Sequence, residues 1–301
     1  NGTLTVTGVG ATGAGRANSP LVITGNKATI DALLATLVYT PSAAFSGADA
    51  LRMHTSDANG NTDTDFVNIT VNADTRALTV TGTTVNEASP YVYFQVAGVA
   101  GQFVQLDLAT TGTGNGHAVQ SIDYLPNLEY FNGTTWIAYT GSVVKVPAGN
   151  NLLVRTGVLQ DTLNEGAETL KLIATNTAGT AYNGDSTIND DGTGSIFLGN
   201  NTFAADTSGA GFPAYLDDDR PVSVDNISVN EASPWAMFTV TGHANQVLSL
   251  TLVDGTAQVG EGSPADGTED FSPALQYWNG STWTNYNGTS VTLTGTTLLV
   301  R

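Results

Sequence analysis

The chain has 301 residues, of which 41% are hydrophobic and 12% are charged, and its 9 Lys and Arg against 27 Asp and Glu give a net charge of −18. This length suits two or three domains with their own cores. The shortage of basic side chains excludes nucleic acid as a partner, because phosphate contacts need Lys and Arg. The chain contains no cysteine, which excludes disulfides and thiolate chemistry. No stretch approaches the ~20 apolar residues of a membrane helix, so no membrane insertion is predicted.

Short runs rich in Val, Thr, Ile and Leu, separated by Gly, Asn, Asp and Ser, predict strands along the whole chain. The clearest runs are 3–7, 66–71, 92–96, 104–108, 169–174, 237–240 and 248–252. Apolar residues at helical spacing predict one short helix over 27–37. Asn-Gly steps at 59–60, 132–133, 183–184, 279–280 and 287–288 are turn signals. This pattern predicts an all-β protein made of immunoglobulin-like β-sandwiches in an extended array.

An internal repeat divides the chain. VNEASP at 85–90 returns at 229–234, FNGTTW at 131–136 returns as WNGSTW at 278–283, and LLVR at 152–155 returns at 298–301. Tandem copies of a β-rich unit are typical of an array rather than of one catalytic body. The second copy stops where the first continues for about 40 residues, so we expect a piece of a longer polypeptide. The predicted boundaries give units at 1–74, 75–219 and 220–301.

The segment from about 76 to 197 resembles the Calx-beta domain, a calcium-binding sandwich known from sodium–calcium exchangers and very large bacterial surface proteins. The matching residues are VNE at 85–87, DY at 123–124, the acidic run that leads into a strand at 161–172, and INDDGTG at 188–194. The unit from 220 resembles the first part of the same domain. One departure is Gln160, which stands where the family often has another acidic residue.

Residues 1–73 resemble the end of the cadherin-like repeats of large bacterial adhesins. The matching residues are LVYTP at 37–41, FSGAD at 45–49 and DANG at 57–60. The resemblance implies that the first strands of this domain lie upstream of Asn1. The run from 57 to 65 also alternates Asp or Asn with small residues, as a calcium loop does, although a plain hairpin explains it as well.

The Calx-beta resemblance implies that the acidic motifs gather at one end of the sandwich. So many carboxylates cannot sit together ionised without a cation, and calcium, which takes about 6–8 oxygen ligands, fits them. The alternative is a solvated acidic rim, or a solvated linker for the residues at the junction. The predicted metal ligands are Glu87, Asp123, Asp161, Glu165, Glu168, Asp190 and Asp191, with Glu231 and Asp270 in the second copy and Asp217 and Asp219 at the junction.

Two further patterns leave alternatives open. Trp and Tyr flank the Asn-Gly turns at 130–136 and 277–283, where they could stack on sugar rings or simply pack across a hairpin. The three histidines recur at no matching repeat position, and no GxSxG, HExxH or phosphate-binding loop is present. We therefore expect no enzyme and no catalytic residue.

The sequence predicts a calcium-stabilised structural segment of a large secreted bacterial surface protein that serves cell adhesion, in a biofilm for example, or a cell-surface layer. Its expected location is extracellular, and its expected partners are neighbouring repeats, copies of itself or surface glycans. A carbohydrate-binding module and a subunit of a self-assembling filament or sheath are the alternatives.

Overall fold

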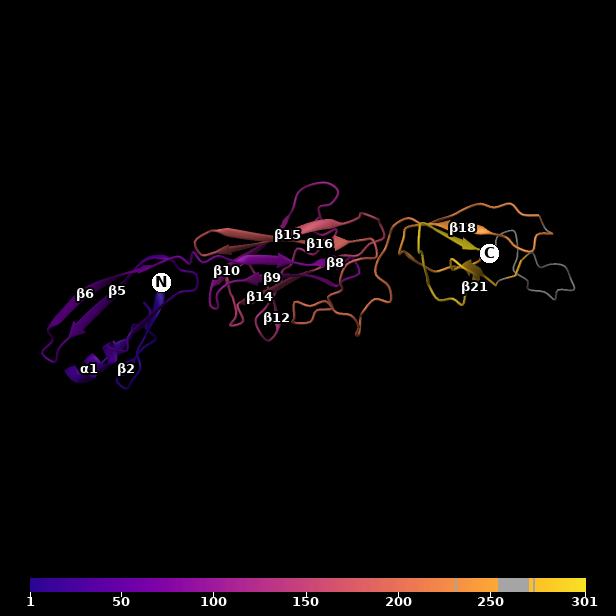
Figure 1. Ribbon diagram of the computed structural model, residues 1–301. Helices are drawn as coiled ribbons and strands as arrows, with labels where there is room; N and C mark the ends of the chain where they lie inside the picture. Colours follow the sequence, from indigo (N-terminus) through magenta and orange to yellow (C-terminus); the bar gives the residue numbers. More distant parts are fainter. Residues whose placement is uncertain (231, 254–270, 273) are drawn as a thin grey trace.

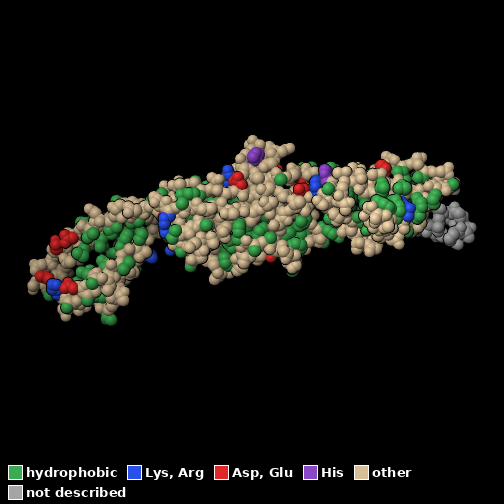
Figure 2. Space-filling model, in the orientation of Figure 1, with side chains coloured by type: hydrophobic (Ala, Val, Ile, Leu, Met, Phe, Trp, Pro, Cys, Tyr) green, Lys and Arg blue, Asp and Glu red, His purple; other side chains and the backbone are tan. Residues whose placement is uncertain are grey.

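The computed structural model describes residues 1–230, 232–253, 271–272 and 274–301. The chain forms three β-rich units in a row along an extended molecule (Figure 1). Almost every element is a strand, which confirms the predicted all-β fold class. The single helix in the described part has eight residues and is too short to cross a membrane. The face shown in Figure 2 carries few charged side chains among uncharged polar and hydrophobic ones.

The first unit consists of three separate strand pairs and the helix. β1 pairs with β4, β2 with β3 and β5 with β6, all antiparallel. Its elements are β1 (Gly2–Thr5), β2 (Ala11–Thr12), β3 (Val22–Ile23), α1 (Lys27–Leu34), β4 (Val38–Pro41), β5 (Gly47–Ser56) and β6 (Thr62–Val71). Among the described residues of this unit, Leu33 is the one apolar side chain that is fully buried.

The predicted helix begins where expected and ends three residues early. Asn26 caps it, because its side-chain oxygen accepts a hydrogen bond of 2.9 Å from the Thr29 N–H. At the other end the Thr36 hydroxyl donates to the Leu33 carbonyl. The Leu37 N–H donates to the Leu34 carbonyl, which tightens the last turn and directs the chain into β4.

The middle unit is a sandwich of two five-stranded sheets. One sheet has the order β13-β10-β15-β16-β8 and the other β12-β11-β14-β9-β7. The strands are β7 (Thr79–Gly82), β8 (Thr84–Asn86), β9 (Tyr91–Ala97), β10 (Phe103–Thr110), β11 (Glu129–Phe131), β12 (Trp136–Ala138), β13 (Val144–Lys145), β14 (Asn151–Gly157), β15 (Glu168–Asn176) and β16 (Ala181–Asn189).

Strict alternation in β15 shows how the sequence builds this core. Every second residue of β15 is buried, since successive side chains of a strand point to opposite faces. Leu172 lies opposite Leu108 of β10, and Ala174 lies opposite Leu106. These side chains join one continuous apolar core that both sheets of the middle unit share.

The third unit repeats one sheet of the middle unit in full. The order β17-β18-β23-β20-β21 matches β7-β9-β14-β11-β12, and β19 pairs with β22 as β10 pairs with β13. The strands are β17 (Ser223–Val224), β18 (Phe238–Thr241), β19 (Val247–Leu248), β20 (Gln276–Trp278), β21 (Trp283–Asn285), β22 (Val291–Thr292) and β23 (Thr297–Val300).

Four of the five Asn-Gly steps lie between strands, as predicted. The prediction is wrong for Asn183-Gly184, which lies inside β16. A Cβ atom at Gly184 would lie 2.3 Å from the Val80 carbonyl oxygen. This glycine is therefore needed for close approach of two strands and not for a turn.

Candidate metal centre

The strand order brings the predicted acidic residues to the end of the middle unit that faces the third unit. β8 and β16 are parallel neighbours, so Glu87 and Asp190, which follow them, leave the sheet at the same end. Glu168 begins β15 and lies opposite Ile188 of β16. In Figure 1, β8 and β16 both point toward the third unit.

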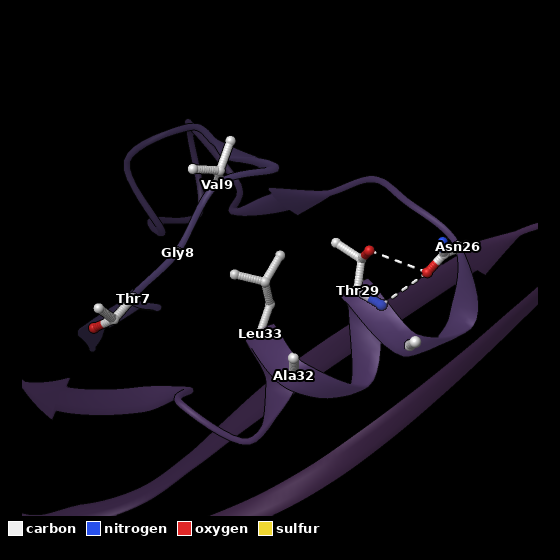
Figure 3. Close-up of a pocket in the computed structure, with 8 residues that line it drawn as sticks. Thr7, Gly8, Val9, Asn26, Thr29, Ala32 and Leu33 are labelled. Carbon is white, nitrogen blue, oxygen red and sulfur yellow. Dashed lines mark hydrogen bonds between the residues drawn. The ribbon is translucent and has the colours of Figure 1, made fainter.

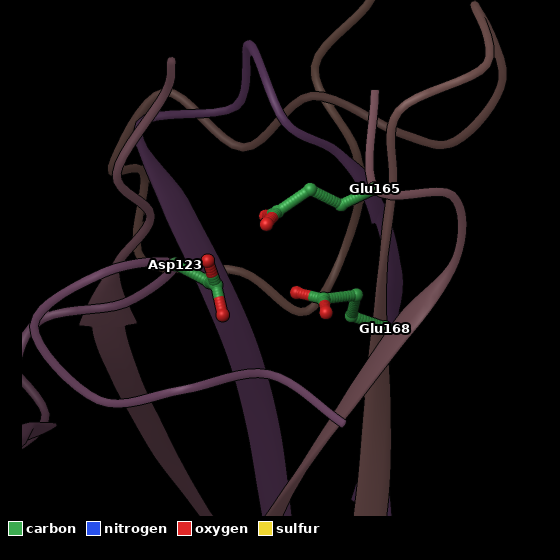
Figure 4. A group of neighbouring side chains, drawn as sticks. All are labelled: Asp123, Glu165 and Glu168. Atoms are coloured by element: carbon green, nitrogen blue, oxygen red, sulfur yellow. The ribbon is translucent and has the colours of Figure 1, made fainter. Parts of the chain in front are cut away.

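Six carboxylates form two groups there, and within each group one oxygen from each carboxylate lies within 4.8 Å of the corresponding oxygens of the other two. The first group points its side chains toward a common centre (Figure 4) and consists of Asp123, Glu165 and Glu168. The second joins the end of β16 to the segment that leads into the third unit, and consists of Asp190, Asp217 and Asp219.

Asp190 connects the two groups. It is 3% exposed, and its Oδ2 accepts a hydrogen bond of 2.9 Å from the Glu165 N–H. Its Oδ1 accepts one of 3.2 Å from the Asp219 N–H. One buried carboxylate thus ties the loop before β15 to the chain that enters the third unit.

Glu87 lies next to both groups. It is buried, and its Oε1 accepts a hydrogen bond of 3.1 Å from the Asp161 N–H. Burial, opposed by that hydrogen bond and reinforced by the charges of Asp190, Asp217 and Asp161, raises the pKa of Glu87 to about 7. The unit thus holds a carboxyl group that resists ionisation near neutral pH.

Other carboxyl groups of the cluster also have raised pKa values. Burial and a hydrogen bond with Asp123 raise the pKa of Glu168 to about 8. Burial, reinforced by neighbouring carboxylates, also raises the pKa values of Glu165, Asp190 and Asp219. A nearby cation would lower these pKa values again, because it favours the charged forms of the carboxyl groups.

Within the described residues, no Lys or Arg forms an ion pair with the six carboxylates of the two groups, although the charge of Arg220, which pairs with Asp218, lies near enough to interact with Asp190. The ion pairs in this part of the chain involve other acids, namely Asp31, Asp49, Asp74, Glu129, Asp185 and Asp218. The Oδ2 atom of Asp219 is buried and has no hydrogen-bond partner. A set of carboxylate oxygens with one unsatisfied buried atom fits a hard divalent cation such as calcium.

Not every predicted ligand belongs to this cluster. Asp191 lies outside both groups, and its carboxylate accepts hydrogen bonds from the Thr193 N–H and hydroxyl in a local turn. Glu231 and Asp270 lie outside the described residues. Gln160 contacts the cluster through its amide, which donates a hydrogen bond of 2.6 Å to Asp217 Oδ2.

Asn86 is a residue of the site that the sequence analysis did not single out. It is fully buried, its Oδ1 accepts from the Asp217 N–H at 2.8 Å, and its Nδ2 donates to the Asp217 carbonyl at 3.0 Å. This amide therefore fixes the backbone of one candidate ligand. Its recurrence as Asn230 in the repeated hexapeptide is the signal that could have identified it.

An equivalent Asp–Arg ion pair is present at each of the two junctions between units. Asp74 accepts two hydrogen bonds from the Arg76 guanidinium, and Asp218 accepts the same two from Arg220. The flanking residues differ, because Ala73 and Thr75 occupy the positions that Asp217 and Asp219 occupy 144 residues later. Of the two junctions, the one between the middle and third units carries the candidate ligands.

The aromatic repeats form hairpins whose rings pack across the strands. Phe131 lies opposite Trp136 with ring centroids 5.5 Å apart, and Tyr93 stacks on Trp136 at 5.3 Å. The Arg155 guanidinium lies 4.1 Å from the Trp136 ring centroid. This geometry matches the packing alternative, since three neighbours already contact the Trp136 ring.

Two features of the first unit, an acidic hairpin and a cavity, are weaker candidates for a binding site. The acidic run from 57 to 65 forms the β5–β6 hairpin, where Asp57 accepts hydrogen bonds from the N–H groups of Asn59 and Asn61. A cavity of about 460 Å³ lies between α1 and the chain at 7–9 (Figure 3). Its lining has no titratable side chain and consists of Thr7, Gly8, Val9, Asn26, Ala28, Thr29, Ala32 and Leu33.

Comparison with known proteins finds a family similarity for the first unit. Residues 1–70 match the family model of the bacterial Ig domain. No curated protein matches the sequence. The match supports the coarser class, a bacterial Ig-like repeat, whereas the cadherin-like and Calx-beta assignments of the units stay predictions.

Several solved structures show distant similarity to the chain. A CupB2 chaperone from Pseudomonas aeruginosa is 8% identical, with 72% of this chain and 83% of that one covered and a TM-score of 0.24. A 1.5-MDa bacterial ice-binding adhesin is 12% identical, with 85% and 64% covered and a TM-score of 0.20. A tetra-tandem repeat of a large adhesion protein is 13% identical, with 83% and 74% covered and a TM-score of 0.17. Similarities this distant carry no argument about either fold or function.

Proposed function

We propose that this chain is a calcium-stabilised structural segment of a large secreted bacterial surface protein, in which β-sandwich units in series serve adhesion or a cell-surface layer. The observation that carries the proposal is the pair of carboxylate groups at the junction of the middle and third units. The match of residues 1–70 to a bacterial Ig domain supports a repeat protein of this class. The role is structural, and we propose no catalysis.

Calcium would be held by Asp123, Glu165 and Glu168 in one group and by Asp190, Asp217 and Asp219 in the other. Bound calcium neutralises carboxylates that repel one another when ionised. A ligand that binds the folded state alone also stabilises that state. Because Asp217 and Asp219 lie on the connecting segment, the same cation would hold this segment against the end of the middle unit.

Thermal unfolding of the full chain tests the metal. We expect millimolar calcium, compared with a chelator, to raise the melting temperature of the middle unit by roughly 5–10 °C, the effect of a ligand at about 100 times its Kd on a domain of this size. Magnesium at the same concentration should have a smaller effect, because it demands a tighter octahedral geometry.

Two variants and one control test whether the calcium-dependent rise in melting temperature comes from the acidic cluster. Asp190→Asn and Glu165→Gln keep the shape of the side chains but remove one charge, so each should abolish most of the calcium-dependent shift. Asp107→Asn, on an exposed position of β10, should leave it unchanged. Equal stability in calcium and in chelator would show instead that the cluster is a solvated acidic rim.

A further inference from the structure

The turn between β11 and β12 concentrates hydrogen-bond donors on one asparagine side chain. Asn132 Oδ1 accepts bonds of 2.9 Å from the N–H groups of Thr134 and Thr135 and from the Thr134 hydroxyl. All three residues are exposed. The next residue in the chain is Gly133, whose N–H donates no hydrogen bond among the described residues. A polarised side-chain amide is therefore followed directly by an unengaged backbone nitrogen.

The turn between β20 and β21 repeats this arrangement. Asn279 Oδ1 accepts hydrogen bonds of 2.9 to 3.0 Å from the N–H groups of Ser281 and Thr282 and from the Ser281 hydroxyl. Gly280 follows, and its N–H likewise donates no hydrogen bond within the described part of the chain. The same three donors thus meet one amide oxygen at matching positions of the two repeats.

Two other Asn-Gly steps have different surroundings. In the turn between β5 and β6, Asn59 Oδ1 accepts no hydrogen bond from the described residues, and the Gly60 N–H donates to the Asp57 carbonyl at 3.2 Å. Asn183 and Gly184 lie inside β16, where antiparallel pairing with β15 fixes the backbone. The same dipeptide therefore occurs with three donors, with none, and within a strand.

Donors on the amide oxygen favour attack by the neighbouring backbone nitrogen on the side-chain amide. When the Gly133 nitrogen attacks Asn132 Cγ, negative charge develops on Oδ1, and preorganised hydrogen-bond donors stabilise such an oxyanion. The new C–N bond closes a succinimide ring, and the side-chain nitrogen leaves as ammonia with the proton from the glycine nitrogen. Water then opens the ring at either carbonyl and gives aspartate or isoaspartate. The reaction consumes only water.

We propose that Asn132 and Asn279 are sites of self-modification, at which the folded turn promotes conversion of asparagine to aspartate or isoaspartate. Each conversion adds one negative charge to an exposed turn. Isoaspartate also adds a methylene group to the main chain between Phe131 and Trp136, which lie opposite each other in the hairpin. The modification therefore accumulates with the age of the chain and loosens the hairpin that holds the Trp136 ring.

The two sites differ at the nitrogen that leaves. Asn279 Nδ2 donates a hydrogen bond of 3.0 Å to Thr284 Oγ1. The matching position in the middle unit is Ile137, which has no side-chain oxygen. Ammonia leaves Asn279 only after this bond breaks, so Asn279 should react more slowly than Asn132.

The experiment incubates the full chain at neutral pH and follows each site by peptide mapping with mass spectrometry. We expect aspartate and isoaspartate first at Asn132, then at Asn279, and at both before Asn59, while Asn183 stays unchanged. Thr134→Val removes one donor and should slow conversion at Asn132 by about tenfold, less than the loss of a donor in a buried enzyme site because water screens the turn.

Thr135→Val is the matched control. The Thr135 hydroxyl contacts the Trp136 carbonyl at 3.4 Å and not Asn132, and the N–H that donates to Asn132 remains in this variant. Conversion at Asn132 should therefore keep its rate.

Incubation in urea separates the effect of the fold from that of the dipeptide. The rates at Asn132, Asn59 and Asn183 should become similar in the unfolded chain. Equal rates at Asn132 and Asn59 in the folded protein, an unchanged rate in Thr134→Val, or conversion only in urea would each overturn the proposal. These outcomes are independent of calcium binding at the acidic cluster.

Discussion

At the residue scale, Gly184 and Arg155 each contribute to the packing of the middle unit. Gly184 lies in the middle of β16, and its φ is outside the left-handed region that favours glycine. Its role is to leave space for the Val80 carbonyl. Arg155 is 8% exposed and donates to Glu129 Oε2 at 2.7 Å and to the Gly199 carbonyl at 3.1 Å. Gly184 thus allows two strands to approach closely, and Arg155 connects two strands and a loop through buried hydrogen bonds.

Substitution of Gly184 tests the close approach. We expect Gly184→Ala to lower the free energy of unfolding of the middle unit by about 1–3 kcal/mol, the usual cost of overpacking, because its Cβ atom would overlap a backbone oxygen. Gly149→Ala is the matched control, since nothing lies within 4 Å of its added Cβ. Urea unfolding measures both, and equal losses would show that Gly184 has no packing role.

Arg155 combines a buried ion pair with aromatic contacts. Its guanidinium lies 3.9 Å from the Tyr91 ring centroid. We expect Arg155→Met to destabilise the middle unit by about 3 kcal/mol, the lower end for breaking a buried pair, because Glu129 stays partly exposed. Arg52→Met, at an exposed position of β5, should change urea unfolding little. A loss no greater than that of Arg52→Met would argue against the buried pair as a source of stability.

At the element scale, the strand ends are what create the acidic cluster. β8, β15 and β16 are neighbours in one sheet. The acids at their ends are buried together, although Glu87 is 81 positions from Glu168 and 103 positions from Asp190. The raised pKa values of Glu87 and Glu168 follow from this burial. They make the stability of the metal-free unit dependent on pH.

The sign of this dependence is opposite to that of an ordinary salt-bridged acid. Glu87 has an ordinary pKa of 4.5 and a folded value of about 7, so between these values the folded state binds more protons than the unfolded state. Without metal, the contribution of Glu87 and Glu168 is greatest below about pH 4.5 and is lost as the pH rises through 7 to 8.

Melting temperatures measured in chelator from pH 5 to 8 test the predicted loss of stability with rising pH. We expect the double variant Glu87→Gln, Glu168→Gln to flatten the decline, and calcium to reverse it at pH 8 in the unchanged protein. A decline of the same size in the double variant would assign it to other groups.

At the scale of the whole molecule, the two junctions differ in what can hold them. Both have the Asp–Arg ion pair, and Gln102 and Gln246 donate to the carbonyls of Arg76 and Arg220 in the same way. The candidate metal ligands Asp217 and Asp219 belong to the second junction. Calcium should therefore stiffen the extended chain at one of its two joints.

Distance distributions between spin labels test this difference. The chain has no cysteine, so labels can be placed at Ser142→Cys and Thr294→Cys across the second junction, and at Ser56→Cys and Ser142→Cys across the first. We expect calcium to narrow the distribution across the second junction and to leave the first unchanged. Equal narrowing at both would contradict a clamp formed by Asp217 and Asp219.

Much of this protein was determined by the sequence alone, because alternation and turn residues are local properties. They predicted the all-β class, the position of the helix and strands such as β10 and β15, and the repeated motifs pointed to acidic residues that do meet at one end of a sandwich. The helix ended early because Thr36 and Leu37 donate hydrogen bonds to the carbonyls of its last turn. Asn183-Gly184 formed no turn because it lies inside β16, where the chain passes close to Val80.

The tertiary structure decided the rest. Hydrogen bonds of the connecting segment to Asn86 and Asp190 bring Asp217 and Asp219 into the cluster, whereas Asp191 accepts hydrogen bonds in a separate turn. Strand pairing buried Val85 while its repeat counterpart Val229 stays exposed. Two copies of one hexapeptide thus have different environments, because burial depends on which strands lie alongside a segment and not on the segment itself.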